Sequence, residues 1–362
     1  MTSFEEKSDD SPSGNPQLPA GDNLLPPVEP PSAGFIIQLF VVPALIVLVI
    51  VSVWFTFSWL VRRTATHPQD LIRGLEQGAS IARWQRASEL ADMLRNERFA
   101  EFKRSPTEAE QLAGILNRAI DEADPAGAMD ENEVAFRAFL AKALGEFEVN
   151  DGVEVLLKAA NTNRGPAERL VRYYAIDALA VRAFNLQRLE PPQDLEHTDL
   201  VPTLSRLASD EDPLIRRRTA YALDKLGTPE AIERLEPMAD DPDPDTRYNA
   251  AVGLAHHGNE RAVETLAEMI DVEELASVQE ESVEQDRVFK RAVIVGNALQ
   301  AVEALAQKNP GADLSLVTES LERLSTAEAD ELARVYIPTR AAANARRVLE
   351  ALRTKGVETI AL

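Results

Sequence analysis

The chain has 362 residues, of which 45% are hydrophobic and only 6% aromatic, and it contains no cysteine. Its formal net charge of -22 repels nucleic-acid phosphates and anionic lipid head groups, since proteins that bind either usually carry a clustered excess of Lys and Arg. Nucleic-acid binding is therefore not expected, and disulfides, thiolate catalysis and Cys-ligated zinc are excluded.

The first segment, residues 1–34, carries seven prolines and six acidic residues but only one Lys. It has no apolar periodicity that could bury a core, so the sequence predicts a disordered acidic tail. Residues 35–61 then run without a single charge and exceed the roughly 20 apolar residues that a membrane-spanning helix needs. A cleaved signal peptide is the alternative, but this segment starts far from Met1 and lacks a basic region before it. We therefore expect a transmembrane helix.

The orientation of this helix is predicted from the basic residues around it. Arg62 and Arg63 follow it directly, whereas the basic residue that precedes it is the distant Lys7. Because Lys and Arg accumulate on the cytoplasmic side of a membrane span, we expect a single-pass protein of the cell membrane. The N-terminus would lie outside and the C-terminal region in the cytoplasm.

The strongest pattern in the remaining chain is internal repetition, which indicates a stack of similar units. Aligning Val201–Gly227 with Ile232–Gly258 matches Leu204 with Leu235, Asp212-Pro213 with Asp243-Pro244, Arg216 with Arg247, Leu223 with Leu254 and Gly227 with Gly258. Each copy is typical of a first helix, an acidic turn and a second helix. Asp is suited to cap the second helix, Pro to its first position and Gly to its C-terminal end.

An Arg followed seven residues later by a Leu recurs beyond these two copies. The pairs are Arg83 and Leu90, Arg137 and Leu144, Arg172 and Leu179, Arg216 and Leu223, and Arg247 and Leu254. The recurrences predict at least five helical pairs. Their uneven spacing leaves room for a further helix or pair in the first interval and for a longer loop near Glu190-Pro191-Pro192.

On these residues the chain resembles the HEAT-repeat family, specifically short bacterial repeats related to the phycobilin-lyase HEAT-like group. The resemblance implies an all-α solenoid of helical pairs, here preceded by a single transmembrane helix. The expected divisions are juxtamembrane helices with a divergent first repeat (62–130), HEAT-like repeats (131–270), an acidic insertion (271–287) and terminal repeat or capping helices (288–362). The resemblance to the HEAT-repeat family also implies that the second helix of each pair lines the inner curve and that the array serves as a protein-interaction surface.

Two groups of residues are candidates for distinct roles. We expect Asp212, Arg216, Asp243 and Arg247 to form a structural ladder, because in related repeats the Arg at the Arg216 position pairs with loop Asp residues. The candidate partner-binding face is formed by residues that the core stripe does not require. They are Arg217, Tyr221, Tyr248 and one of Tyr173 and Tyr174, since Tyr and Arg are enriched among energetic interface residues. Ordinary packing between repeats is the alternative for this second group.

The sequence contains no complete motif for metal binding or catalysis. Asp241, Asp243 and Asp245 resemble the start of a calcium loop, but Thr246 and Val252 stand where its Gly and its bidentate Glu belong. His256 and His257 are adjacent and point about 100° apart on a helix, so they do not readily chelate one metal ion. We therefore expect no catalytic residue, no cofactor and no metal, and the chain is predicted not to be an enzyme.

The preferred interpretation is a membrane-anchored scaffold or adaptor whose partners are proteins and, through residues 35–61, the lipid bilayer. One alternative is an enzyme similar to the phycobilin lyases. Another is a transmembrane sensor that uses residues 1–34. The acidic insertion fits a docking loop for a basic partner, with a solvated linker or an extended helix as the alternative.

Overall fold

A computed structural model describes residues 33–63, 67–77, 79–123, 130–162, 165–273, 278 and 281–360. The chain divides into two compact units, one up to Ala65 and one from Thr66 onward, and each is described by itself. The disordered tail predicted for residues 1–34 lies almost entirely outside the described residues.

The first unit contains the single helix α1, Ala33–Arg63, with Pro43 inside it. Its stretch Leu39–Thr56 is 18 residues long, apolar and unburied, and is long enough to cross a membrane. The hydroxyl of Thr56 donates a hydrogen bond to the carbonyl of Ser52, 2.7 Å away. This bond satisfies a polar group that hydrocarbon would not solvate.

The second unit is built of helices, and its described residues contain no strand. They form α2 (Pro68–Gly74), α3 (Ser80–Leu94), η1 (Glu97–Phe99), α4 (Ala100–Lys103), α5 (Pro106–Asp121), α6 (Glu131–Gly145), α7 (Val153–Ala160), α8 (Glu168–Gln187), α9 (Leu200–Leu207), α10 (Pro213–Leu226), α11 (Pro229–Leu235), η2 (Pro237–Asp240), α12 (Pro244–His256), η3 (Glu260–Ala262), α13 (Val263–Ile270), α14 (Glu284–Lys308), α15 (Ser315–Thr326), α16 (Ala329–Arg334) and α17 (Arg340–Ile360).

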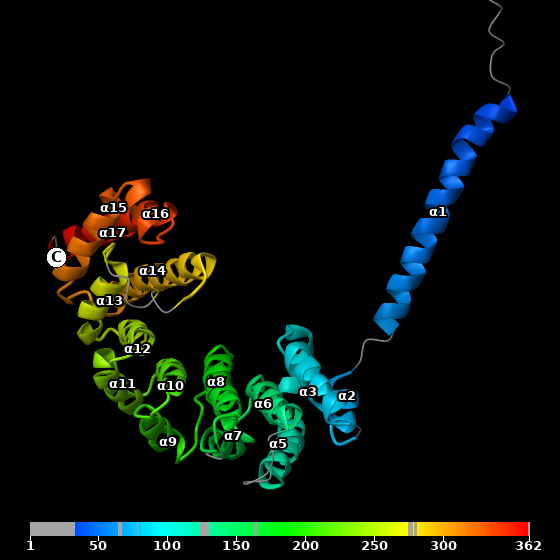
Figure 1. Ribbon diagram of the computed structural model, residues 1–362, viewed down its shortest axis with the longest axis horizontal. Helices are drawn as coiled ribbons and strands as arrows, with labels where there is room; N and C mark the ends of the chain where they lie inside the picture. The colour runs from blue at the N-terminus through cyan, green and yellow to red at the C-terminus, as the bar shows by residue number, and fades with distance from the viewer. Residues whose placement is uncertain are drawn as a thin grey trace, which may run out of the picture. The chain divides into compact units, whose positions relative to one another are not determined.

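These helices stack as pairs along a curve. The second helices α3, α6, α8, α10, α12 and α14 contact one another in chain order. In Figure 1 they line the inner side of the curve, whereas α5, α7, α9 and α11 lie on its outer side. Helices α15 to α17 close the C-terminal end. The predicted fold class, an all-α solenoid of helical pairs, is confirmed.

The sequence explains where two of the inner helices begin and end. The carboxylate of Asp212 accepts a hydrogen bond from the Leu214 amide at the start of α10. Asp243 accepts one from the Thr246 amide at the start of α12. Pro follows each Asp at the first helical position, where its missing N–H costs no hydrogen bond. Gly227 ends α10 with a φ of 63°, a left-handed conformation that favours glycine.

The recurrent leucines explain why the helices stack. Leu90, Leu144, Leu179, Leu223 and Leu254 are all fully or almost fully buried. Each lies on the inner helix of its pair, in one continuous core that extends through the array. Since burying one such side chain stabilises a protein by roughly 1.5–3 kcal/mol, a pair that lacked its neighbours would lose this contribution. This dependence on neighbours is typical of repeat proteins.

Candidate functional site

Each of the five recurrent arginines bonds to a carboxylate that follows it in the chain. Arg83 contacts Glu133 at 3.0 Å, Arg216 contacts Asp241 at 2.8 Å and Arg247 contacts Glu268 at 2.7 Å. Arg137 pairs with Glu168 and Arg172 with Asp210. The recurrence of Arg at this position therefore coincides with a row of ion pairs that link successive units.

The residues expected to form a structural ladder occupy this row and the turns beside it. The Arg216 guanidinium also donates to the backbone carbonyl of Asp210, and that of Arg247 donates to the carbonyl of Asp241. Asp212 caps α10 and forms a salt bridge with Arg169, with Nε and Oδ2 2.6 Å apart. Asp243 caps α12 and accepts a hydrogen bond from Nε of Arg217 at 2.7 Å. Each Asp thus serves one helix start and one arginine of the preceding inner helix.

A row of aromatic rings crosses the inner helices. Trp84 of α3 stacks on Phe139 of α6 with ring centroids 6.0 Å apart, and Phe139 lies 5.8 Å from Tyr174 of α8. Tyr173 meets Tyr174 edge to face at 5.4 Å. The Arg218 guanidinium of α10 then lies 4.4 Å from the centre of the Tyr173 ring and 5.4 Å from that of Tyr221. These rings are half-buried, so the row offers partly exposed aromatic surface on four successive units.

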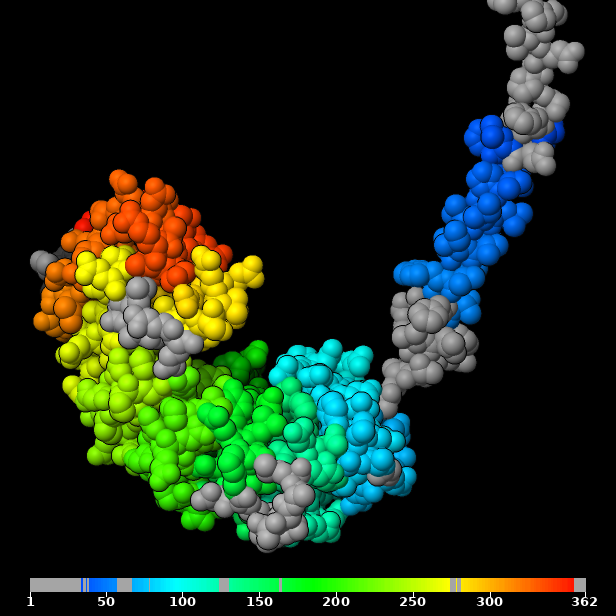
Figure 2. Space-filling model, viewed as in Figure 1, coloured from blue at the N-terminus to red at the C-terminus, as the bar shows by residue number. Residues whose placement is uncertain are grey.

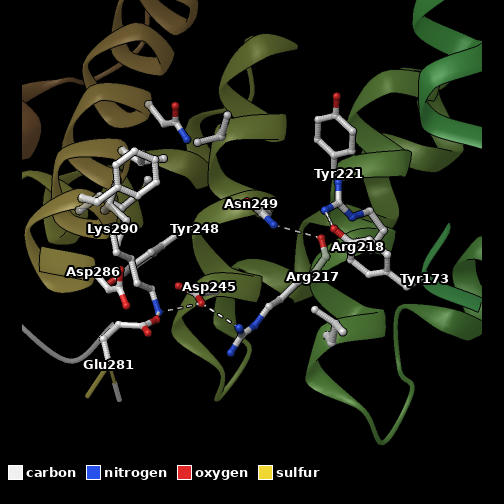
Figure 3. Close-up of a pocket in the computed structure, with 17 residues that line it drawn as sticks. Tyr173, Arg217, Arg218, Tyr221, Asp245, Tyr248, Asn249, Glu281, Asp286 and Lys290 are labelled. Carbon is white, nitrogen blue, oxygen red and sulfur yellow. Dashed lines mark hydrogen bonds and ion pairs between the residues drawn. The ribbon is translucent and has the colours of Figure 1, made fainter. Parts of the chain in front are cut away.

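The row leads into a cavity of about 520 Å³ between α8, α10, α12 and α14. Figure 2 shows the inner side of the repeat unit as a hollow between the green and the yellow segments. In Figure 3 Tyr173, Arg218 and Tyr221 lie on one side of this cavity, while Lys290, Glu281 and Asp286 lie on the other. Asp245 lies between them, 2.9 Å from Arg217 and 3.1 Å from Lys290.

The structure brings the predicted partner-binding residues to this inner side, in different settings. Arg217, Tyr221 and Tyr173 line the cavity and Tyr174 lies beside it in the aromatic row. Tyr248 also borders the cavity, but it is only 3% exposed and its hydroxyl donates to Glu268 at 2.9 Å. This burial fits the alternative given for the group, ordinary packing between repeats, with Glu268 of α13 at the phenol hydroxyl. That these residues bind a partner stays a prediction.

Sequence reasoning did not single out Phe139, Arg218, Phe289 or Lys290 for this side. A positional signal exists for the first two. Phe139 follows Arg137 by two residues, and Tyr174 and Arg218 stand two residues after Arg172 and Arg216. Two residues correspond to about 200° around a helix, so this position points away from the ion-paired arginine and toward the inner side.

The acidic residues between α11 and the first turn of α12 form a helix cap and ion pairs. Asp241 binds Arg216, Asp243 caps α12, and Asp245 binds Arg217 and Lys290. Among the described residues no group of three or more His, Asp or Glu side chains is arranged to hold a metal ion.

His256 and His257 converge on one buried carboxylate of the neighbouring unit. Nδ1 of His256 lies 3.0 Å from Asp224, and Nε2 of His257 lies 2.9 Å from the Asp224 backbone carbonyl and 3.4 Å from its carboxylate. Burial opposes ionisation of Asp224, but the hydrogen bonds from His256 and His257 outweigh it and hold its pKa well below the usual value. The hydrogen bond to Asp224 raises the pKa of His257, although burial and Lys225 oppose this.

These shifts predict how pH changes the free energy of unfolding. The raised pKa of His257 stabilises the fold fully below about 6.5, the unfolded value, and this contribution is lost as pH rises through the folded pKa. The contribution of Asp224 is present above about pH 3.9 and is lost on acidification. We expect the thermal midpoint of the full chain in detergent, followed by circular dichroism, to fall between pH 6 and pH 9. His257→Gln should show a smaller fall, and an equal fall in both proteins would contradict the assignment.

Comparisons with known proteins support the repeat fold. A family described as HEAT repeats matches residues 164–243 and 206–285. No curated protein matches the chain. Among solved structures, human deoxyhypusine hydroxylase in complex with glycerol is similar, with 16% identity over 78% of this chain and 84% of that chain and a TM-score of 0.28. The finer resemblance, to the phycobilin-lyase group of bacterial repeats, stays a prediction.

The prediction that the chain is not an enzyme is contradicted, because a hydroxylase is among the structures that it resembles. The absence of a catalytic motif was its basis, and a repeat array can draw reactive side chains from separate units that no short motif reveals. The likeness is too low to assign any reaction here. What is established is structural: residues 164–285 of this chain carry HEAT repeats, set in an all-α solenoid.

Proposed function

We propose that the chain is a membrane-tethered scaffold whose inner face binds a segment of a partner protein. The observation that carries this proposal is the row of half-buried rings from Trp84 to Tyr221, which leads into the open cavity beside α14. Large aromatic side chains and Arg account for much of the binding energy at protein interfaces. A row that crosses several units suits an elongated partner better than a small molecule.

The tether is the second part of the proposal. The apolar stretch of α1 is 18 residues long, which corresponds to about 27 Å at 1.5 Å per residue and approaches the roughly 30 Å of a bilayer core. Arg62 and Arg63 at its C-terminal end favour an array on the cytoplasmic side. Confinement to a membrane raises the local concentration of a binding module, so a modest affinity suffices for function.

Site-specific photocrosslinking in membranes of the native cells tests both parts. Benzophenone-alanine replaces Tyr221 on the inner side in one variant and exposed Glu233 on the outer helix α11 in a matched control. We expect a discrete crosslinked protein from position 221 at a yield several times that from position 233. The full chain should sediment with membranes after a carbonate wash, whereas a chain that lacks residues 33–63 should not.

Equal yields from the two positions, or a product from position 233 alone, would mean that the inner face is not the binding surface. Release of the full chain by carbonate would refute the tether.

A further inference from the structure

The cavity beside α14 continues into a second one, and together they form a groove. The second cavity has a volume of about 590 Å³ and is lined by residues at the start of α6, α8 and α10, including Val134, Leu170 and Leu214. Tyr173 and Leu214 border both cavities. We call the two together the inner groove. The inner helices from α6 to α14 are separated by four intervals. Since packed helices lie about 8–10 Å apart, these intervals together span about 35 Å. An extended peptide of about 11 residues covers this distance.

Both ends of the inner groove hold apolar side chains that the chain itself leaves exposed. Leu170 is 42% exposed at one end, and Phe289 and Val293 are 72% and 42% exposed at the other. Helix α14 has 25 residues whereas α12 has 13, so α12 cannot cover all of α14. Asp286, Phe289, Lys290 and Val293 follow one another at helical spacing on this side of α14. The first turns of α14 therefore present an uncovered face with Phe289 at its centre.

The charge left over in the groove is negative. The cations that line it are all engaged: Arg169 with Asp212 at 2.6 Å, Arg217 with Asp245 at 2.9 Å, Arg218 with Asp177 at 2.9 Å, and Lys290 with Asp245 and Glu281 at 3.1 and 3.3 Å. Asp286 is exposed and forms no ion pair with any described residue. Glu284, two residues earlier, is exposed as well but lines neither cavity. The α14 end thus has a lining carboxylate that forms no ion pair with the described residues, beside an exposed aromatic ring.

We propose that the inner groove binds an extended segment of a partner protein that places Lys or Arg beside Asp286 and an apolar side chain beside Leu170. This inference rests on the proposed function and names the chemistry of the partner. A cationic side chain gains the Asp286 carboxylate and the face of Phe289 together, because aromatic rings attract cations. The net charge of -22 draws a basic segment toward the array and repels phosphate-rich nucleic acid and anionic lipid. A peptide therefore fits the groove better than either.

Fluorescence anisotropy with peptide pools provides the test. The protein is the full chain in nanodiscs of phosphatidylcholine, whose zwitterionic head groups do not attract basic peptides. Two fluorescein-labelled pools of about 11 residues share an apolar residue near one end and differ at the other, where one has Lys and Arg and the other has Asp and Glu. We expect saturable binding of the basic pool, which weakens as salt is raised, and no saturable binding of the acidic pool.

Charge-reversal variants locate the contact. Asp286→Lys should weaken binding of the basic pool about tenfold, whereas Glu154→Lys, which makes the same charge change on the exposed side of the outer helix α7, should change it less than about twofold. Phe289→Ser should weaken binding about fivefold. Both residues on α14 are exposed, so the circular dichroism spectrum of each variant should match that of the native chain.

Each contrary outcome has a definite meaning. Absence of saturable binding by the basic pool, equal binding of the acidic pool, or equal effects of Asp286→Lys and Glu154→Lys would each overturn this inference. If the crosslink from position 221 forms in any of those cases, the proposed function survives and only the basic partner is wrong. If the crosslink is absent too, both proposals fail.

Discussion

Replacing Glu168 by alanine is expected to lower the free energy of unfolding by about 3–5 kcal/mol, the usual cost of removing one partner from a buried ion pair. Glu168 lies in the first turn of α8 and pairs with Arg137 of α6, and both side chains are buried. Without Glu168 the Arg137 guanidinium would remain in the core without its counterion. Chemical denaturation of the full chain in detergent, followed by circular dichroism, measures the loss.

A double variant separates the cost of the lone charge from the value of the pair. Nε of Arg137 and Oε2 of Glu168 form no hydrogen bond with any described residue, so the pair offsets its own desolvation incompletely. Arg137→Met combined with Glu168→Leu should therefore recover stability to within about 1.5 kcal/mol of the native chain. If Glu168→Ala alone cost less than about 1 kcal/mol, water would reach this pair and the buried assignment would be wrong.

Gly145→Ala is expected to lower the free energy of unfolding by about 2–3 kcal/mol, even though alanine is the better helix former. Gly145 lies at the end of α6 and faces Ala178 of α8. A Cβ atom there would lie 2.5 Å from Cα of Ala178 and 2.6 Å from its Cβ. Because the obstacle is the backbone of α8, the two helices must move apart and the row of core leucines must shift with them.

Gly296→Ala is the matched control for this substitution. Gly296 lies within α14, and a Cβ atom added there meets no atom within 4 Å. The same chemical change should then raise the free energy of unfolding by up to about 1 kcal/mol. Equal effects at both positions would show that helix propensity, and not the close approach of α6 and α8, decides the outcome. Denaturant titration of both variants in one detergent makes the comparison.

The local features of this fold follow from the sequence because they depend on near neighbours in the chain. A carboxylate before a proline caps a helix wherever it occurs, as Asp212 and Asp243 do. The interval of seven residues between Arg and Leu returns both side chains to nearly the same face of a helix. The inner helices α3, α6, α8, α10 and α12 could therefore be located from Arg83, Arg137, Arg172, Arg216 and Arg247.

The partners of these arginines did not follow from the sequence in the same way. Arg216 binds Asp241 in the following turn, as the Asp-rich turns of related repeats imply, but Arg247 binds Glu268 on α13 and Arg137 binds Glu168 on α8. The lengths of the intervening segments differ, so the nearest carboxylate comes from a different element in each unit. The burial of Tyr248 has the same origin, since α13 brings Glu268 over its hydroxyl.

Some residues of the candidate site could likewise be placed from the sequence, and others could not. Tyr173, Tyr174, Arg217 and Tyr221 could be placed near one face because each stands one, two or five residues after a recurrent Arg. Phe289 and Asp286 could not, because α14 departs from the Arg-to-Leu spacing and their exposure depends on where the shorter α12 ends beside it.

The sequence by itself therefore determined an apolar helix able to span a membrane, an all-helical array of repeats, and the residues that begin, end and stack its inner helices. These properties depend on hydropathy, capping and periodicity, which act over a few residues. Only the tertiary structure decided which carboxylate each Arg binds, which tyrosine is buried, and where two cavities join into one groove. Those properties depend on distances between separate units, and the lengths and crossings of the helices set these distances.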